Sequence, residues 1–420
     1  MAGRRVMRGA LLWALALIWP AASPAQAPAQ APAPPIPLPE FCRPPEMLGG
    51  AEIVVCVPPA WNGDLVVFAH GYVAPTNGAA QIPWDQLALP DGTSLPGIVT
   101  GLGFAFATTS YSDDGLAVVQ GVKDVQALVD YFIKELRYDT DHVYLVGASE
   151  GGLVTTLAVE QASDVFSGGL ATCGPVGDFR RQVDYWGDFG VLFDYFFPRF
   201  FPDGVLNAGD DVRQEWESDY VPEITRALVL NPARLDKLLR VSHAPFDPNE
   251  PQTKIKTALG ILWYNVFATS DAKEKLGGNP YDNSRRLYLG SGNDFWLNLL
   301  VKRYHADPPA LDTIEHDYQT TGELAAPLVT LHTTADPIVP YWHEPLYSVK
   351  ALANSGLLHT NLPVFRYGHC SFKAEEALVG LGLLVLKVEG RELLNAERVL
   401  PTRQAKLRYR SLAKMNGLRR

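Results

Sequence analysis

The sequence G-A-S-E-G at residues 147–151 constrains the fold of this chain more than any other feature. It follows V-Y-L-V at 143–146, a run typical of a buried strand, and it leads into residues 151–161, whose pattern predicts a helix. Small residues two before and two after a serine let a strand turn sharply into a helix and lift the hydroxyl clear of the sheet. In this position the pattern predicts that Ser149 is a nucleophile.

Short apolar runs alternate with longer helical patterns, which is typical of an α/β fold with a mostly parallel sheet. Residues 177–324 contain no clear strand but are rich in helical patterns and aromatic residues. An insertion of this length between two strands predicts a helical cap rather than a loop. Besides 143–146, we expect strands at 65–68, 104–109, 169–172, 327–332 and 364–367, and helices at 118–136 and 375–388.

The N-terminal residues have a pattern of their own. Residues 1–25 combine a basic start with an apolar stretch too short to span a bilayer, which indicates a cleaved signal peptide and a secreted or periplasmic protein. A retained membrane anchor is the alternative. Residues 26–40 alternate Ala, Gln and Pro, which predicts an extended tether.

The remaining boundaries follow from these patterns. We expect the α/β core to comprise residues 41–176 and 325–400, with the cap at 177–324 between its two parts. Residues 401–420 form a basic C-terminal tail, which we expect to be solvated or to form a surface helix. Contact with a membrane or a polyanion is the less favoured interpretation of that tail.

Composition excludes several classes of function. The formal net charge of −10 argues against nucleic-acid binding, because phosphates reward clustered Lys and Arg. The sequence contains neither a C-x-x-C pair nor an H-E-x-x-H motif, so we expect no metal site. After the signal no run of 18 apolar residues occurs, so we expect no stable membrane insertion.

A serine nucleophile needs a general base and a carboxylate that orients that base. His369 follows the last expected strand in R-Y-G-H-C, and Asp336 follows the strand before it in T-A-D-P-I-V-P. The order Ser149, Asp336, His369 is the one that accompanies this nucleophile motif. The alternatives are His343 or His359 for the base, and Glu344, Asp184 or Asp188 for the acid.

The tetrahedral intermediate of acyl transfer needs two N–H donors aimed at its oxyanion. The amide of Glu150 follows the nucleophile and supplies one donor. The second is expected in the turn after strand 65–68, where Gly71 permits close approach and the Tyr72 amide is our choice.

The four cysteines are all found after the expected signal. In an oxidising compartment an even number suggests disulfides. A short local loop favours Cys42 with Cys56, which would leave Cys173 with Cys370; buried free thiols are the alternative.

Together, A-H-G-Y, G-A-S-E-G-G, T-A-D-P-I-V-P and Y-G-H-C resemble the α/β-hydrolase superfamily over residues 60–176 and 325–390. The resemblance implies a central sheet of about eight mostly parallel strands, with the site at their carboxyl ends. It also implies acyl transfer through a covalent acyl-enzyme, without a cofactor.

One subgroup adds a further expectation. Tannase and feruloyl-esterase-like enzymes carry one cysteine before the serine and another after the histidine, joined as a disulfide. Cys370 matches the second, whereas Ala148 stands in the first position. The resemblance therefore implies that Cys173, at the end of the next strand, takes the role of partner and pins the histidine loop to the sheet.

Aromatic residues are concentrated at the start of the expected cap. Tyr185, Phe189, Phe193, Phe196 and Phe200 have the spacing of one helical face. We expect the aromatic residues to form an apolar lid that binds substrate, although packing of the cap is the alternative for each. A carboxylic ester is the substrate class that we expect, with a peptide second and a non-catalytic binding protein third. The lid residues expected to bind substrate are Tyr185, Trp186, Phe189 and Phe193.

Overall fold

The computed structural model describes residues 38–75, 80–390 and 394–418. The chain divides into two units, Met1–Pro35 and Ile36–Arg420, and every element described below belongs to the second. The expected signal peptide and nearly all of the expected tether lie outside the described residues.

The core of the second unit is an eight-stranded sheet with the order β1-β2-β4-β3-β5-β6-β7-β8. The pairs β1–β2 and β2–β4 are antiparallel, and the other neighbours are parallel. This confirms the predicted α/β fold with its mostly parallel sheet. The strands are β1 (Glu46–Leu48), β2 (Ala51–Cys56), β3 (Leu65–Ala69), β4 (Ala105–Thr109), β5 (Val143–Ala148), β6 (Gly168–Thr172), β7 (Leu328–Ala335) and β8 (His359–Tyr367).

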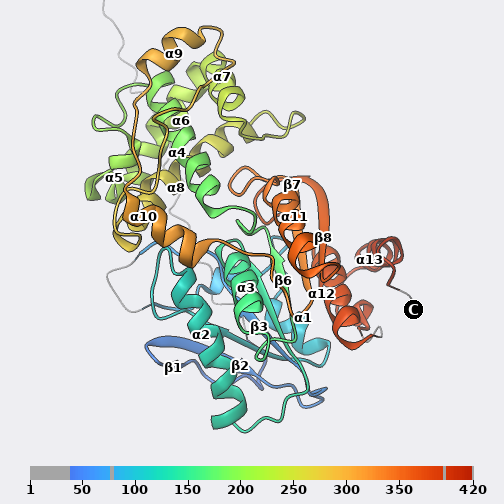
Figure 1. Cartoon of the computed structure of the whole chain (residues 1–420). Helices are drawn as coiled ribbons and strands as arrows, with labels where there is room; N and C mark the ends of the chain where they lie inside the picture. The colour runs from blue at the N-terminus through green and yellow to red at the C-terminus, as the bar shows by residue number, and fades with distance from the viewer. Residues whose placement is uncertain (1–37, 76–79, 391–393, 419–420) are drawn as a thin grey trace, which may run out of the picture. The chain divides into compact units, whose positions relative to one another are not determined.

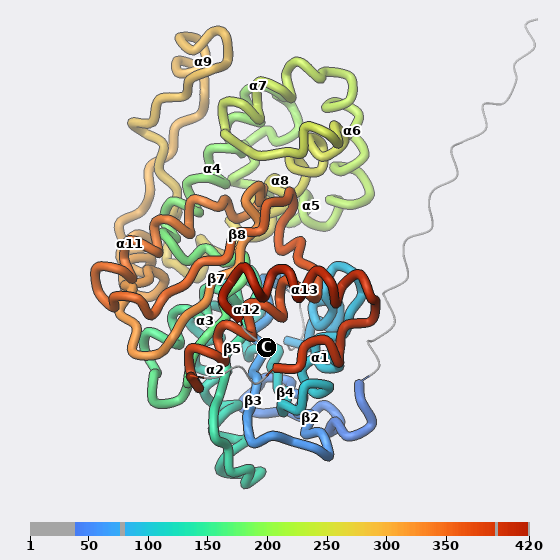
Figure 2. Tube along the Cα trace, turned by 90° about the vertical axis from the view of Figure 1, so that its right-hand side faces the viewer, coloured from blue at the N-terminus to red at the C-terminus, as the bar shows by residue number. Residues whose placement is uncertain are grey.

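The central strands are buried on both faces, because helices cover the sheet from two sides. Along β3, Leu65 and Val67 point into one apolar cluster, and Val66 and Phe68 into the other. One cluster includes side chains of α2 (Val118–Asp130), α3 (Glu150–Gln161) and α11 (His343–Ser355). The other includes those of α1 (Leu95–Gly101), α12 (Ala374–Glu389) and α13 (Arg403–Met415), the side toward the viewer in Figure 2.

Seven α-helices stand between β6 and β7 in the described chain, within the residues expected to form the cap (Figure 1). The chain enters this region from the carboxyl end of β6, so the first cap helix starts beside the site expected at that edge. The helices are α4 (Phe179–Phe196), α5 (Asp210–Gln214), α6 (Val221–Leu230), α7 (Pro232–Ser242), α8 (Thr253–Lys275), α9 (Asp294–Leu300) and α10 (Pro308–Thr313).

Several strands and helices of the structure are not predicted by the sequence pattern. Strands β1 and β2 and helices α1 and α11 have no counterpart in the expectations, and β8 begins before the expected 364–367. The C-terminal residues form a helix whose Tyr409 and Ala413 are buried in the same cluster as α12, while most of its basic side chains stay exposed. Within the described ranges, no helix has both the length and the apolarity needed to cross a bilayer.

Candidate active site

Ser149 stands at the turn between β5 and α3, in a backbone conformation with φ of 58° and ψ of −120°. A non-glycine residue rarely adopts a positive φ, so the surrounding packing must hold it there. A Cβ atom on Gly147 would lie 2.0 Å from the carbonyl oxygen of Gly151, and one on Gly151 would lie 2.0 Å from that of Ala69. Only glycine fits these two positions, which explains the motif.

The structure brings Ser149, His369 and Asp336 together from three separate segments. His369 Nε2 lies 2.8 Å from Ser149 Oγ, and His369 Nδ1 lies 2.7 Å from Asp336 Oδ2. The histidine follows β8 and the aspartate follows β7, so the parallel pairing of these two strands places both residues at one edge of the sheet. In this sequence of hydrogen bonds the imidazole can take the proton of the hydroxyl and return it during acyl transfer, while the carboxylate orients the ring.

Asp336 is completely buried, yet it is held as a carboxylate. Its Oδ1 accepts hydrogen bonds from the amides of Ile338 (2.8 Å) and Val339 (3.0 Å). Burial would raise the pKa of Asp336, but the charge of His369 and hydrogen bonds from His332 and His369 lower it to about 2. Pro337 stands in the chain between Asp336 and these two amides.

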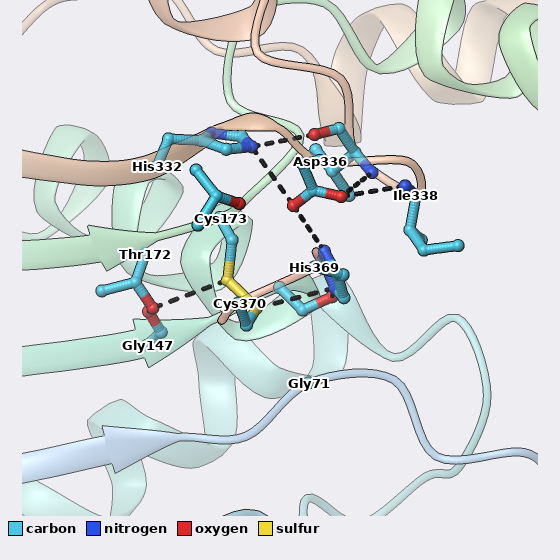
Figure 3. Close-up of a disulfide and its surroundings, with 12 residues drawn as sticks. Gly71, Gly147, Thr172, Cys173, His332, Asp336, Ile338, His369 and Cys370 are labelled. Atoms are coloured by element: carbon cyan, nitrogen blue, oxygen red, sulfur yellow. Dashed lines mark hydrogen bonds and ion pairs between the residues drawn. A yellow bond between two sulfur atoms is a disulfide. The ribbon is translucent and has the colours of Figure 1, made fainter. Parts of the chain in front are cut away.

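Sequence reasoning missed a second histidine behind this carboxylate (Figure 3). His332 is fully buried; its Nδ1 lies 2.9 Å from Glu344 Oε1 and its Nε2 lies 2.8 Å from the carbonyl oxygen of Val339 and 3.5 Å from Asp336 Oδ2. Both ring nitrogens face acceptors, which favours a proton on each of them and hence an imidazolium. Burial alone would lower the pKa of His332, but hydrogen bonds and charges from Asp336 and Glu344 raise it to about 10.

The two histidines considered as alternative bases form hydrogen bonds with other groups. His343 Nδ1 accepts the amides of Gly177 and Asp178 at 3.0 and 3.3 Å, and its Nε2 donates to Gln182 Oε1. His359 contacts the hydroxyl of Thr330.

The three carboxylates considered as alternative acids also have other partners. Glu344 accepts hydrogen bonds from His332, Thr330 and Asn361. Asp184 and Asp188 both form ion pairs with Arg286 within the cap. None of these interactions reaches Ser149.

The first cap helix braces the loop that carries Asp336. Tyr185 Oη donates to the carbonyl oxygen of Pro337 at 2.8 Å, and Trp186 Nε1 and Gln182 Nε2 both donate to that of Ile338 at 2.9 Å. These three side chains tie α4 to the core at the site itself. Tyr185 is therefore placed as a support of the acid loop, a role different from the substrate contact expected for it.

The other three aromatic residues of the expected lid differ in their surroundings: one lines a cavity and two are buried. Trp186 lines a chamber next to Ser149 and stacks on Tyr264, with ring centroids 4.8 Å apart. Phe189 and Phe193 are wholly buried in the apolar cluster and line no cavity found beside Ser149 among the described residues. Tyr185, Phe189, Phe193 and Phe196 lie on α4, but Phe200, expected on the same helical face, lies beyond the end of that helix. Phe189 and Phe193 pack in the apolar cluster rather than against a substrate site.

The two expected oxyanion donors flank the nucleophile. Glu150 begins α3, so its amide belongs to the helix N-terminus, and the Gly71–Tyr72 turn approaches so closely that a Cβ on Gly71 would lie 3.1 Å from Ser149 Cβ. The amide of Gly71 is used by Gln86 Oε1 at 2.7 Å, whereas those of Tyr72 and Glu150 have no hydrogen-bond partner among the described residues.

Both cysteine pairs are disulfides in the structure. Cys42 pairs with Cys56, and Cys173 pairs with Cys370. Cys370 follows His369 directly, and Cys173 follows β6, so the second bond ties the histidine loop to the sheet beside the site (Figure 3).

Removing the Cys173–Cys370 bond is expected to lower the free energy of unfolding by about 2 kcal/mol more than removing Cys42–Cys56, because a longer loop gains more chain entropy when it is released. The sequence separations are 197 and 14 residues. Urea unfolding of the two double-alanine variants measures the difference. Equal losses, or a larger loss for the Cys42–Cys56 variant, would contradict it.

Among the described residues, two cavities that open on Ser149 stand out. The first, here called the α8 chamber, has about 610 Å³ of empty space including its opening to solvent, and its walls are almost entirely apolar. Its lining includes Leu153, Phe179, Val183, Trp186, Ala268 and Ala272. The second, here called the His369 pocket, has about 1050 Å³ of empty space and a more polar wall. Its lining includes Phe68, Gln86, Leu95, His369, Cys370 and Ala377.

Glu150 is the one acidic residue in the wall of the α8 chamber as far as the structure describes it. Its carboxylate oxygen accepts the amide of Ala117 at 2.7 Å. Burial raises the pKa of Glu150 to about 8, although the hydrogen bond from Ala117 opposes the shift. Its side chain is therefore mostly neutral at pH 7, which suits an apolar chamber.

Comparison with known families gives one match. Residues 98–186 match the family described as the prolyl oligopeptidase family, a stretch that runs from α1 through the nucleophile turn into α4. No curated protein matches the chain.

Several solved structures resemble it weakly. An acylaminoacyl peptidase from Pyrococcus horikoshii is 13% identical over 84% of this chain, with a TM-score of 0.41; the chain spans only 42% of that protein's length. Feruloyl esterase B from Aspergillus oryzae is 14% identical over 82% of this chain and 79% of its own, with a TM-score of 0.43. Candida antarctica lipase A is 13% identical over 84% and 74%, with a TM-score of 0.44.

Likenesses this weak say nothing about what the chain acts on. The eight-stranded sheet with its strand order, the strained serine turn between β5 and α3, and the family match over that turn lead to one conclusion. This chain has the α/β-hydrolase fold, with Ser149 at the turn that follows its β5 strand.

Proposed function

We propose that the chain hydrolyses carboxylic esters through an acyl-enzyme, with Ser149 as nucleophile, His369 as general base and Asp336 as the carboxylate that orients it. The hydrogen bonds of 2.8 and 2.7 Å among these side chains support the assignment. The amides of Tyr72 and Glu150 are the donors proposed for the oxyanion.

The reaction has two halves. Ser149 Oγ attacks the ester carbonyl while His369 Nε2 takes its proton; the ring then gives that proton to the departing alcohol oxygen as the tetrahedral intermediate collapses to the acyl-enzyme. Water repeats the attack with the same base, and the acid is released as Ser149 recovers its proton. The negative charge of Asp336 stabilises the imidazolium that forms in each half.

The apolar wall of the α8 chamber is the observation that favours an ester. A peptide carries a backbone N–H and C=O at every residue, and burying them without partners costs free energy. An ester with an apolar acyl group makes no such demand. The expected substrate is therefore a small or polymeric ester with an apolar or aromatic acid part.

The match of residues 98–186 to the prolyl oligopeptidase family favours a second candidate, a serine peptidase. The same three side chains can attack an amide. A peptide would have to place its polar backbone outside the α8 chamber, in the more polar His369 pocket.

The compartment is also a proposal. Two disulfides support an oxidising environment, in keeping with the signal peptide expected from the sequence. We propose that the mature protein is secreted or periplasmic.

Parallel assays test the proposed function. We expect the purified chain to hydrolyse p-nitrophenyl esters with a kcat/KM at least about 100-fold above that for aminoacyl p-nitroanilides, a difference of roughly 2.7 kcal/mol. We also expect a fluorophosphonate probe to label the wild type but not Ser149→Ala. Preference for the anilides would establish the peptidase instead, and absence of labelling would leave only a binding protein.

A further inference from the structure

The two cavities at Ser149 differ in which catalytic groups they contain. Ser149, Tyr72 and Tyr264 line both, so these three residues form the boundary between them. His369 lines the His369 pocket and is absent from the wall of the α8 chamber. The nucleophile therefore has one open space on the side of its base and another on the opposite side.

The chemistry of ester cleavage assigns these two spaces. When the tetrahedral intermediate collapses, the bond between the carbonyl carbon and the alcohol oxygen breaks, and that oxygen takes the proton from His369 Nε2. The alcohol oxygen must then lie within hydrogen-bond reach of the ring, which places the alcohol in the His369 pocket. The acyl chain stays bonded to the same carbon and extends from it in another direction, toward the α8 chamber.

The shape of the α8 chamber indicates which acyl groups it holds. One face of α8 lines the chamber with residues spaced four apart, namely Tyr264, Ala268 and Ala272. Tyr264 also lines the His369 pocket beside Ser149, and the two small alanine side chains come after it along the helix. Phe179, Val183 and Trp186 of α4 form part of the wall. The wall is almost entirely apolar, which favours an aliphatic acyl chain.

Its length follows from the geometry of α8. Eight residues separate Tyr264 from Ala272, and a helix rises about 1.5 Å per residue, so this wall extends about 12 Å from the nucleophile. An extended alkyl chain of about eight to ten carbons has this length, given C–C bonds of about 1.5 Å.

We propose that the α8 chamber is the acyl site, that it takes aliphatic acyl groups of about eight to ten carbons, and that the His369 pocket takes the alcohol. This inference rests on the proposed esterase function and specifies its substrate class. Ala268 and Ala272 set the usable depth of the acyl site, whereas Ala377, on the opposite side, sets the room for the alcohol.

Blocking the chamber tests the assignment. In the wild type, kcat/KM is expected to rise from p-nitrophenyl acetate to the octanoate. Ala268→Phe should lower kcat/KM for the octanoate by about fourfold for each methylene that it keeps out of the chamber, thus at least about 50-fold overall, while the acetate changes by less than about threefold. Retained acetate hydrolysis shows that the variant is folded.

Two further variants serve as controls. Ala272→Leu, farther from the nucleophile, should lower kcat/KM for the decanoate but leave the hexanoate unchanged, and it replaces Ala268→Phe if that variant does not fold. Ala377→Phe should discriminate between octanoyl esters of methanol and of 2-naphthol, but not between acyl lengths. Ala377 lines the His369 pocket, and its exposure is intermediate, so a larger side chain has room to enter.

The outcomes separate the two proposals. Absence of hydrolysis of every ester would overturn the esterase function itself. Hydrolysis in which Ala268→Phe affects acetate and octanoate equally, or in which Ala268→Phe changes the alcohol preference and Ala377→Phe the acyl preference, would overturn the acyl-site assignment alone.

Discussion

Replacing Asp336 with asparagine is expected to lower kcat for ester hydrolysis by about 10⁴-fold, the size of effect known for loss of the orienting carboxylate in a serine hydrolase. The amide of asparagine carries no charge to stabilise the imidazolium of His369, and it favours the wrong tautomer of the ring. The Asn side-chain oxygen can still accept the amides of Ile338 and Val339, so the loop should keep its conformation.

Steady-state assays with one p-nitrophenyl ester measure this effect. Asp184→Asn is the matched control, because Asp184 is an alternative acid in the sequence but pairs with Arg286 in the cap. We expect it to stay within a few-fold of the wild type. If Asp336→Asn kept kcat within tenfold of the wild type, another group would have to orient the base.

Replacing His332 with leucine is expected to lower the free energy of unfolding by about 3–5 kcal/mol, because it leaves buried charges without their partner. His332 lies 2.9 Å from Glu344 Oε1 and 3.5 Å from Asp336 Oδ2, and all three side chains are almost fully buried. Urea unfolding near pH 6 measures the loss. His316→Leu, at an exposed histidine, should change stability by less than about 0.5 kcal/mol.

The same loss should depend on pH with a definite sign. The pKa of His332 is about 10 in the folded protein against an ordinary value of 6.5, so folding binds a proton that the unfolded chain releases above pH 6.5. The stabilising contribution is complete below about pH 6.5 and declines as the pH rises toward 10. The stability difference between wild type and His332→Leu should therefore shrink over this range.

A double variant distinguishes a charge effect from a loss of packing. His332→Leu leaves two buried carboxylates, Asp336 and Glu344, without their charged partner. The double variant His332→Leu/Glu344→Leu removes one of them, so it should be more stable than His332→Leu alone. A difference from the wild type that is constant between pH 6 and 10, with no recovery in the double variant, would show that His332 is not an imidazolium in the folded protein.

The sequence predicts the parts of this protein that depend on local geometry. The turn at Ser149 needs glycine at 147 and 151, where any Cβ would collide with backbone, so the chemistry of that turn is visible as a motif. Asp336 and His369 each follow a strand that is apolar enough to be recognised. Parallel strands end at one edge, so their order in the chain predicts that they meet.

The support around the carboxylate depends on contacts that no local pattern records. Nothing in H-T-T-A-D indicates that His332 turns back toward Asp336 while Glu344, from the next helix, neutralises it. The spacing of the aromatic residues likewise predicts a helix in the cap. It does not predict which of these side chains pack inside the cap and which line a cavity. Phe193 packs inward and Trp186 lines the chamber, although both lie on the same helix.

The sequence by itself therefore determined the nucleophile turn, the parallel sheet and the position of the three catalytic candidates, because steric exclusion at a turn and burial along a strand act over a few neighbouring residues. Only the tertiary structure decided that His332 carries a buried charge and that two different cavities meet at Ser149. Both are consequences of side chains from distant segments converging in space, and the free energy of such an arrangement depends on all of its members at once.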